Sequence, residues 1–134
     1  MKRINQSNTF PKSQKLTARK DIHALFSKSA KSFHVDCMQV RWIQAFESKE
    51  QSKYLLVVPK RKIGKAVVRN YLKRCMREGV RKNKASLEIL LQNNNEHLHI
   101  ALIYQKNYPL QSNEIEQMVE KGFKHIWNEM AKIA

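Results

Sequence analysis

The sequence predicts an α+β fold, a single-domain α-β sandwich in which helices pack on a small sheet in the order α-β-β-α-β-α. Three observations support this prediction. The chain has 134 residues, the length of one ordinary domain. Its hydrophobic content of 42% is enough to bury a core. Segments with helical periodicity alternate with segments rich in β-branched and aromatic residues, without an internal repeat or linker.

The beginning of the chain is polar and lacks hydrophobic periodicity. Residues 1–15 are therefore expected to form a flexible basic arm, followed by one folded domain over residues 16–134. Thr17 is a candidate N-cap. The apolar residues that follow it have helical spacing and predict a short amphipathic helix over residues 18–28.

Three segments have the composition of strands. Residues 33–46 alternate apolar and polar side chains and predict the first strand, while residues 53–58 predict a mostly buried second strand that Pro59 ends. These two strands are expected to pair antiparallel. Residues 97–105 are almost continuously apolar and predict a third strand.

Two further helices are expected. The first covers residues 66–82 and continues, or restarts, over residues 86–92. The last begins at Ser112 or Asn113, and a wide apolar stripe along it predicts its buried face: Ile115, Met118, Val119, Phe123, Ile126, Trp127, Met130 and Ile133. Trp42, on the first strand, is suited equally to the core and to base stacking.

Charge gives the first indication of function. The chain carries 26 Lys and Arg against 11 Asp and Glu, a net charge of +15 with a pI near 10.1. Residues 60–84 alone carry eleven basic groups and one acidic group, whereas residues 85–134 are net negative. This balance disfavours cationic partners and favours a polyanion, with nucleic acid first and an anionic membrane surface second.

Cellular location follows from what the sequence lacks. The longest apolar runs are too short to cross a bilayer, so no integral membrane protein is expected. Two cysteines, Cys37 and Cys75, are too few for a disulfide framework, and no signal peptide is recognisable. A reducing, cytoplasmic location is therefore expected.

The helix that begins near residue 66 separates charge from apolar surface. At about 100° per residue, Val68, Leu72 and Met76 fall on one face. The opposite side carries a cationic row spaced four residues apart, formed by Arg69, Lys73, Arg77 and Arg81. Like charges at this spacing repel, so a polyanion partner explains the row better than plain solvation does. A membrane-surface or calmodulin-type helix is a weaker alternative, because the sheet already claims the apolar face.

The run from Lys60 to Glu78, KRKIGKAVVRNYLKRCMRE, resembles the signature of the bacterial ribonuclease P protein subunit. That pattern is a basic turn, Arg-Asn-Arg, a Lys-Arg pair two residues on, and an Arg followed by Glu or Gln. The first helix and the strands around residues 55–58 and 100–104 also fit, so the resemblance covers roughly residues 15–130. Tyr71 replaces the last Arg of Arg-Asn-Arg, and Ile22 stands where the family often has Phe.

The resemblance implies an accessory subunit of an endoribonuclease that removes the 5′ leader of precursor tRNA. Catalysis would lie in an RNA subunit, and the protein alone would be inactive. The implied partners are the catalytic RNA and precursor tRNA, with Mg²⁺ expected at the RNA subunit, no cofactor on the protein, no membrane and no DNA. The family fold has a left-handed βαβ crossover, whereas the general rule predicts a right-handed one.

The resemblance also assigns two groups of residues. Those expected to bind the catalytic RNA lie on the basic turn and the helix after it: Lys60, Arg61, Lys62, Lys65, Arg69, Asn70, Lys73, Arg74, Arg77 and Arg81. Those expected to line a cleft between the first helix and the sheet, where the leader would lie, are Lys20, Phe26, Val40, Arg41 and Trp42.

No set of residues predicts catalysis by the protein itself. The chain has two aspartates, too few for a two-metal nuclease site, and no Ser-His-Asp or Cys-His spacing. His97 and His99 share one face of a strand, but without a third ligand they are expected to be structural or surface residues. The alternative function is a ribosomal or other structural RNA-binding protein without a role in cleavage. A protein nuclease that acts alone is the third and least favoured class.

Overall fold

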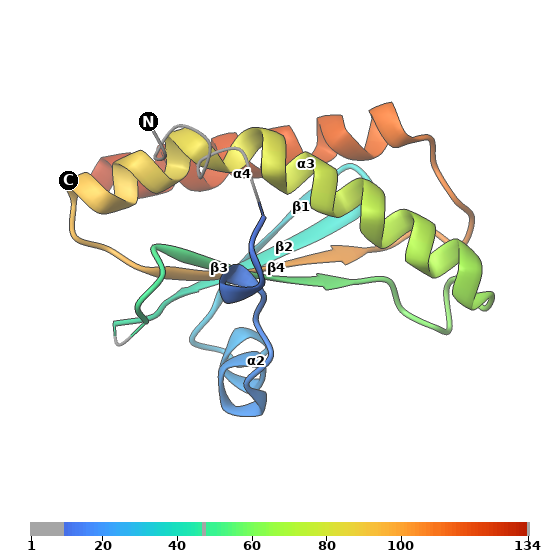
Figure 1. Ribbon diagram of the computed structural model, residues 1–134, viewed down its shortest axis with the longest axis horizontal. Helices are drawn as coiled ribbons and strands as arrows, with labels where there is room; N and C mark the ends of the chain where they lie inside the picture. Colours follow the sequence, from blue (N-terminus) through green and yellow to red (C-terminus); the bar gives the residue numbers. More distant parts are fainter. Residues whose placement is uncertain (1–9, 47, 134) are drawn as a thin grey trace.

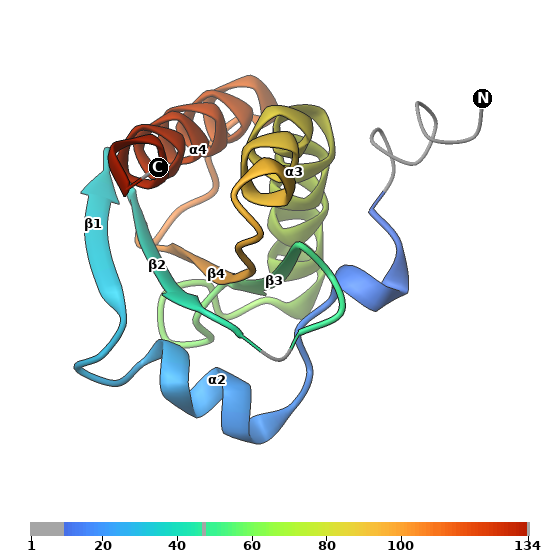
Figure 2. The same ribbon diagram turned by 90° about the vertical axis from the view of Figure 1, so that its left-hand side faces the viewer.

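The computed structural model describes residues 10–46 and 48–133 of the chain. Within them it confirms the α+β class. A four-stranded sheet separates the short helix α2 on one face from α3 and α4 on the other (Figures 1 and 2). The elements in chain order are the 3-10 turn η1 (Lys12–Gln14), α2 (Arg19–Leu25), β1 (Lys31–Val35), β2 (Met38–Gln44), β3 (Ser52–Val57), α3 (Ala66–Asn93), β4 (Leu98–Tyr104) and α4 (Ser112–Ile133).

The first predicted strand is in fact a hairpin. β1 and β2 pair antiparallel from Lys31↔Trp42 to Val35↔Met38. Asp36, in the turn between them, has a φ of 51°, a left-handed conformation that Asp tolerates better than most residues. The element order therefore contains one more strand than the sequence predicted, because this turn carries neither Gly nor Pro.

The sheet has the order β1-β2-β4-β3. β4 pairs antiparallel with β2 and parallel with β3, so the expected antiparallel pairing of the segments 33–46 and 53–58 is wrong. Every residue of β4 is buried, as the central position between two covered faces requires. The continuous apolar character of this strand is the sequence signal for that position.

The β3–α3–β4 unit is the expected crossover, and it is left-handed. The two parallel strands run in the same direction in Figure 1, and α3 returns above the sheet between them. In Figure 2 both strands point away from the viewer and the helices lie above the sheet. In this view β4 lies to the left of β3. This is the handedness that the resemblance implied, against the general rule.

The long helix α3 is continuous over its 28 residues, so the two predicted helical segments are one element. By contrast, α2 is shorter than predicted, with 7 residues. The N-cap position of α2 is Ala18, which makes no side-chain capping bond, so the prediction that Thr17 caps this helix is wrong. Among the described helices, none is both long and apolar enough to cross a membrane.

The main core lies between the sheet and the α3–α4 layer. It contains Met38, Val40 and Trp42 from β2 together with six residues of the predicted apolar stripe of α4: Ile115, Met118, Val119, Phe123, Ile126 and Met130. Phe123 is buried as predicted, and Trp42 is a core residue. Trp127 is 39% exposed, so its predicted place in the core is wrong. A smaller cluster on the other face packs under α2 and includes Leu16, Leu25, Ala101 and Ile103.

The chain is packed from residue 10 onward, earlier than the predicted domain start at residue 16. Residues 1–9 of the predicted arm lie outside the described residues. Phe10 meets the Tyr54 ring edge-to-face at 5.5 Å, and the amide of Leu16 donates to the Tyr54 carbonyl at 2.9 Å. Gln14 is 5% exposed, and its side-chain amide donates to the Glu88 carboxylate of α3. These contacts hold η1 at the edge of β3.

Close packing of α3 on α4 depends on Gly79. A Cβ at this position would lie 2.9 Å from the Cβ of Val119, a distance that forces the helices apart. We expect Gly79→Ala to lower the free energy of unfolding by about 1–2 kcal/mol. Overpacking costs roughly 1–3 kcal/mol, and the better helix propensity of Ala returns about 1 kcal/mol or less.

Denaturant unfolding measures this effect, and Gly64→Ala is the matched control. No atom lies within 4 Å of the added Cβ at Gly64, so its stability is expected to change little. A Gly79→Ala variant as stable as the natural chain would contradict the close approach of the two helices.

Candidate nucleic-acid interface

The orientation of α3 separates its charged and apolar sides as predicted. Leu72, Met76 and Val80 have no exposed surface and face the core. Cys75 and Gly79 lie between them and are also buried. Because successive residues rotate by about 100°, the charged residues of this stretch lie on the other side of the helix. Arg74 and Arg77 are exposed and Lys73 is half-buried. The first half of α3 therefore presents a cationic surface to solvent.

The basic turn before α3 has a fixed backbone. The amides of Lys62 and Ile63 both donate to the Pro59 carbonyl at 3.0 Å, and Ile63 is 5% exposed, which anchors the turn in the core. The Arg69 guanidinium donates to the carbonyls of Ile63 at 3.1 Å and Gly64 at 2.8 Å. Arg69 thus fastens the turn to the first turns of the helix. Of the other basic residues here, the exposed ones are Lys60, Arg61 and Lys65.

Arg81 differs from the rest of the predicted row. Its guanidinium binds both carboxylate oxygens of Glu78, at 3.0 and 2.6 Å. These hydrogen bonds hold the pKa of Glu78 below its usual value. Because the pair is neutral overall, the free cationic surface of the predicted row is concentrated toward the beginning of α3.

A groove runs beside this surface, between α3, the edge of β3 and the N-terminal segment. It has a volume of about 370 Å³. Asn70, Lys73 and Arg77 line it from α3, and Phe10 and Lys15 line it from the opposite side. Its floor contains Tyr54, Leu55 and Leu56 of β3.

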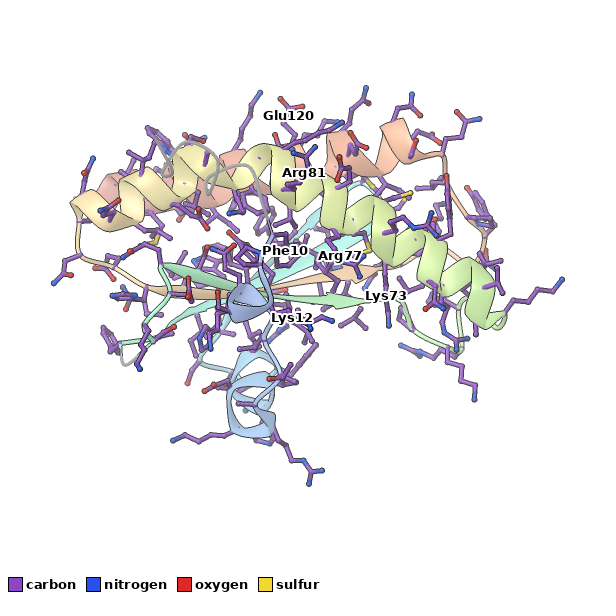
Figure 3. All side chains as sticks on the ribbon, viewed as in Figure 1. Phe10, Lys12, Lys73, Arg77, Arg81 and Glu120 are labelled. Atoms are coloured by element: carbon purple, nitrogen blue, oxygen red, sulfur yellow. The ribbon has the colours of Figure 1, made fainter. Side chains whose placement is uncertain are left out.

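A second cavity of about 180 Å³ adjoins the groove, where Lys12 meets Arg77 and Phe10. Figure 3 shows these side chains beside one another, with Lys73 and Arg81 before and after Arg77 along α3. Phe10, Lys12 and Lys15 were missed as site residues, because the segment around them lacks periodicity. The groove therefore combines cations from two parts of the chain that are distant in sequence.

The predicted cleft on the α2 side of the sheet is only partly as expected. Lys20 is exposed on α2, and Phe26, just after this helix, is 48% exposed. Arg41 donates to the carbonyls of Leu25 at 2.6 Å and Ser27 at 2.9 Å. Its guanidinium carbon lies 5.7 Å from the centre of the Phe26 ring. Arg41 thus connects the end of α2 to the sheet, and its guanidinium lies over the exposed ring of Phe26.

Two residues assigned to this cleft lie on the opposite face of the sheet. Val40 has no exposed surface and Trp42 is 4% exposed, and both belong to the core under α3 and α4. Side chains alternate along a strand, so Arg41 and Ile43 of β2 face α2 while Val40 and Trp42 face away from it. The assignment of Val40 and Trp42 to the cleft is therefore wrong.

Tyr71, which replaces an Arg of the expected motif, is 40% exposed. A hydrogen bond with Cys75 raises the pKa of Tyr71, and Ser112 at the start of α4 also contacts it. The ring thus lies on the side of α3 that faces α4. It does not line the groove described above.

Comparison with known proteins places this arrangement in a family. The model of the family described as Ribonuclease P matches residues 10–127. The RNase P protein of Staphylococcus aureus, solved at 2.0 Å, aligns with a TM-score of 0.65 and 18% identity, over 84% of this chain and 94% of that one. The RNase P protein of Thermotoga maritima aligns with a TM-score of 0.62 and 23% identity, over 83% and 96%.

A search of curated protein sequences gave no match. The two solved structures share less than 25% identity with this chain and bear on its fold alone. The family model, in contrast, spans the packed segment at residue 10, the basic turn, α3 and most of α4. The chain therefore belongs to the Ribonuclease P family, and its fold is that of the bacterial RNase P proteins.

Proposed function

We propose that this chain binds the catalytic RNA of ribonuclease P and the 5′ leader of precursor tRNA, and so assists removal of the leader. The observation that carries the proposal is the cationic surface at the start of α3, on a chain that belongs to this family. Phosphate contacts provide most of the affinity in RNA binding, and this surface supplies them. The exposed cations of this surface are Lys60, Arg61, Lys65, Arg74 and Arg77.

The groove beside α3 extends the proposed RNA-binding surface. Its cations come from α3 and from the N-terminal segment, so a phosphate backbone in the groove would contact both. Phe10 adds an aromatic ring on which an unpaired base can stack. The fixed turn at Ile63 and Gly64 reduces the conformational entropy lost when the RNA binds.

The α2 side of the sheet is the proposed place of the single-stranded leader. Phe26 and Arg41 form a cation–π pair at one end of α2, and Lys20 adds a positive charge on this helix. Half-buried apolar side chains of the sheet, Leu55 and Val57, lie on the same face and replace Val40 and Trp42 in the proposed lining. Bases stacked on rings would bind here without sequence preference.

The protein's own role in this proposal is binding and positioning. Asp36 lies in the β1–β2 turn, where Lys121 pairs with it at 3.2 Å, so it does not join Asp21 of α2 in an acidic cluster. Among residues 10–46 and 48–133, no three His, Cys, Asp or Glu side chains form a group suited to a metal ion. The proposal assigns Mg²⁺ to the RNA subunit and routes no chemical step through this chain.

Leader length provides the test of the proposed path. We expect the protein to accelerate cleavage more for substrates with several leader nucleotides than for those with one. Only a leader of several nucleotides provides enough single-stranded RNA to bind in the cleft. Phe26→Ala should reduce the acceleration for long leaders by about fivefold or more, since each stacked base contributes about 1–3 kcal/mol. Single-turnover rates across a series of leader lengths measure both effects.

Ile89→Ala is the control for this experiment, because Ile89 is 57% exposed on α3, away from the cleft. It should leave the acceleration unchanged at every length. Equal acceleration for all leaders, with or without Phe26, would remove the cleft from the proposal.

A further inference from the structure

The groove beside α3 has an N-terminal wall whose position depends on tertiary contacts. This wall contains Phe10, Lys12 and Lys15, and its one helical turn, η1, has three residues and no side-chain cap. It faces Lys73 and Arg77 of α3 (Figure 3). In the part of the chain that the structure describes, none of these four cations pairs with a carboxylate. Like charges repel, so other contacts must hold the wall against α3.

Gln14 supplies one of these contacts. It is buried between the exposed residues Ser13 and Lys15, and its side-chain amide donates to the Glu88 carboxylate in the second half of α3. A carboxylate only accepts hydrogen bonds, so the amide nitrogen must face Glu88. The amide oxygen is left buried, without a hydrogen-bond partner among the described residues. An unpartnered buried acceptor costs free energy, so stability alone does not explain a glutamine at this position.

The Glu88 carboxylate is the centre of a buried network. It accepts two further hydrogen bonds, from Ser52 Oγ at 2.8 Å and from Lys84 Nζ at 3.3 Å. The Lys84 side chain is 1% exposed and needs this carboxylate, because an unpaired buried charge is strongly destabilising. Glu88 is therefore held in place independently of Gln14, and it joins η1, the start of β3 and α3.

The same network fixes Tyr54. Ser52 donates its one hydroxyl hydrogen to Glu88, so the Tyr54 hydroxyl donates to Ser52 Oγ, at 2.6 Å. Burial, together with the charge of Glu88, raises the pKa of Tyr54, so its hydroxyl stays protonated. The Tyr54 ring meets Phe10 edge-to-face at 5.5 Å, and its backbone carbonyl accepts from the Leu16 amide at 2.9 Å. The carboxylate thus positions the N-terminal segment by a second route.

We propose that Gln14 is a positioning residue for RNA binding. Its bond to Glu88 keeps Lys12 and Lys15 beside Arg77, so that one RNA backbone contacts cations from both walls of the groove. The proposal rests on the proposed function, because this groove is part of that RNA-binding surface. Gln14 itself lines neither cavity and acts through its neighbours. A wall that is held before the RNA arrives loses less conformational entropy on binding.

The salt dependence of RNA binding by the full chain tests this role. Gln14→Ala should weaken binding of the catalytic RNA about tenfold and lower the slope of log affinity against log salt by about one unit or more. Two lysines leave the groove, and each phosphate contact contributes about 0.7–0.9 to the slope. Gln14 is uncharged, so a merely structural role would not change the slope. The variant keeps the Lys84–Glu88 pair, so no buried charge loses its partner.

Three comparisons complete the experiment. Lys12→Ala should lower the slope in the natural chain but change it little in the Gln14→Ala variant, where Lys12 is no longer held in the groove. Gln117→Ala is the matched control, because Gln117 is exposed on α4 and lines neither cavity, so it should leave affinity and slope unchanged. Without RNA, hydrogen exchange at the Leu16 amide should be faster in Gln14→Ala than in the natural chain.

Three results would overturn the proposal: a slope that Gln14→Ala or Lys12→Ala leaves unchanged, a full additional effect of Lys12→Ala in the Gln14→Ala variant, or exchange at the Leu16 amide that does not depend on Gln14. A Gln14→Ala variant that is unfolded at the temperature of the experiment would overturn it as well. In that case Gln14 would be required for the fold and not specifically for the groove.

Heparin, a polyanion that is not RNA, separates this proposal from the proposed function when the same variants are measured with it. Binding of the catalytic RNA with a slope that does not depend on Gln14 would reject the positioning role alone. Heparin slopes that depend on Gln14 and Lys12 as expected, on a chain that does not bind the catalytic RNA, would support the positioning role and reject the proposed function.

Discussion

The affinity of the chain for the catalytic RNA should fall about a thousandfold or more between roughly 50 and 200 mM salt, as expected for six or more phosphate contacts. The turn and the first half of α3 carry enough cations for this number: Lys60, Arg61, Lys62, Lys65, Lys73, Arg74 and Arg77. Each contact releases counterions from the RNA, so the logarithm of the affinity falls by about 0.7–0.9 per contact for each tenfold rise in salt. Filter binding or fluorescence anisotropy over a salt series measures the slope.

Arg77→Ala and Arg81→Ala form an informative pair in the same series. Arg77 is exposed in the groove and should account for about one unit of the slope. Arg81 is already bound to Glu78, so its removal should change the slope less. A nearly flat dependence for the natural chain would contradict a surface that binds phosphates.

Leu72→Ala should lower the free energy of unfolding by about 2–5 kcal/mol, because Leu72 has no exposed surface and its truncation leaves a cavity. Arg77→Ala, five residues later on the opposite side of α3, should change stability by about 0.5 kcal/mol or less. RNA affinity, measured at a temperature where both variants are folded, should show the reverse order.

Thermal or denaturant unfolding, combined with RNA binding, compares the two variants directly. Equal destabilisation by both changes would mean that α3 is rotated relative to the sheet. If only the folded Leu72→Ala variant lost RNA affinity, the result would contradict RNA binding on the charged side of α3.

The sequence predicted α3 best, because charge and hydrophobicity there repeat with the period of one regular structure. Leu72 and Met76 are buried and Arg77 is exposed, as the helical spacing requires. The spacing alone did not predict that Arg81 pairs with Glu78, although the two residues are three apart and such pairs are common on helices.

Tertiary pairing was harder to predict. β2 and β3 follow each other in the chain, yet β4 lies between them after a 28-residue helix. No local pattern reports such a pairing. The left-handed crossover likewise opposes the general rule and was expected only from the resemblance.

The cleft shows a limit of strand patterns. Alternation correctly put Val40 and Trp42 on the same face of β2 and Arg41 on the other. Both faces of the sheet are covered by helices, however, and alternation does not indicate which helix covers which face (Figure 2). Phe10 and Lys12 were missed for a different reason. The contact of Phe10 with Tyr54 is tertiary, and the local sequence does not predict that Lys12 and Arg77 line the same cavity.

The most direct test of the proposed function is the cleavage rate of precursor tRNA at moderate magnesium, measured with the catalytic RNA alone, with both subunits, and with the protein alone. We expect the protein to cleave nothing by itself and to accelerate cleavage at the leader junction when the catalytic RNA is present. The acceleration should shrink at high magnesium or high salt, where ions screen the RNA and weaken the protein's contacts. Cleavage by the protein alone, or binding to the catalytic RNA without any acceleration, would contradict the proposed function.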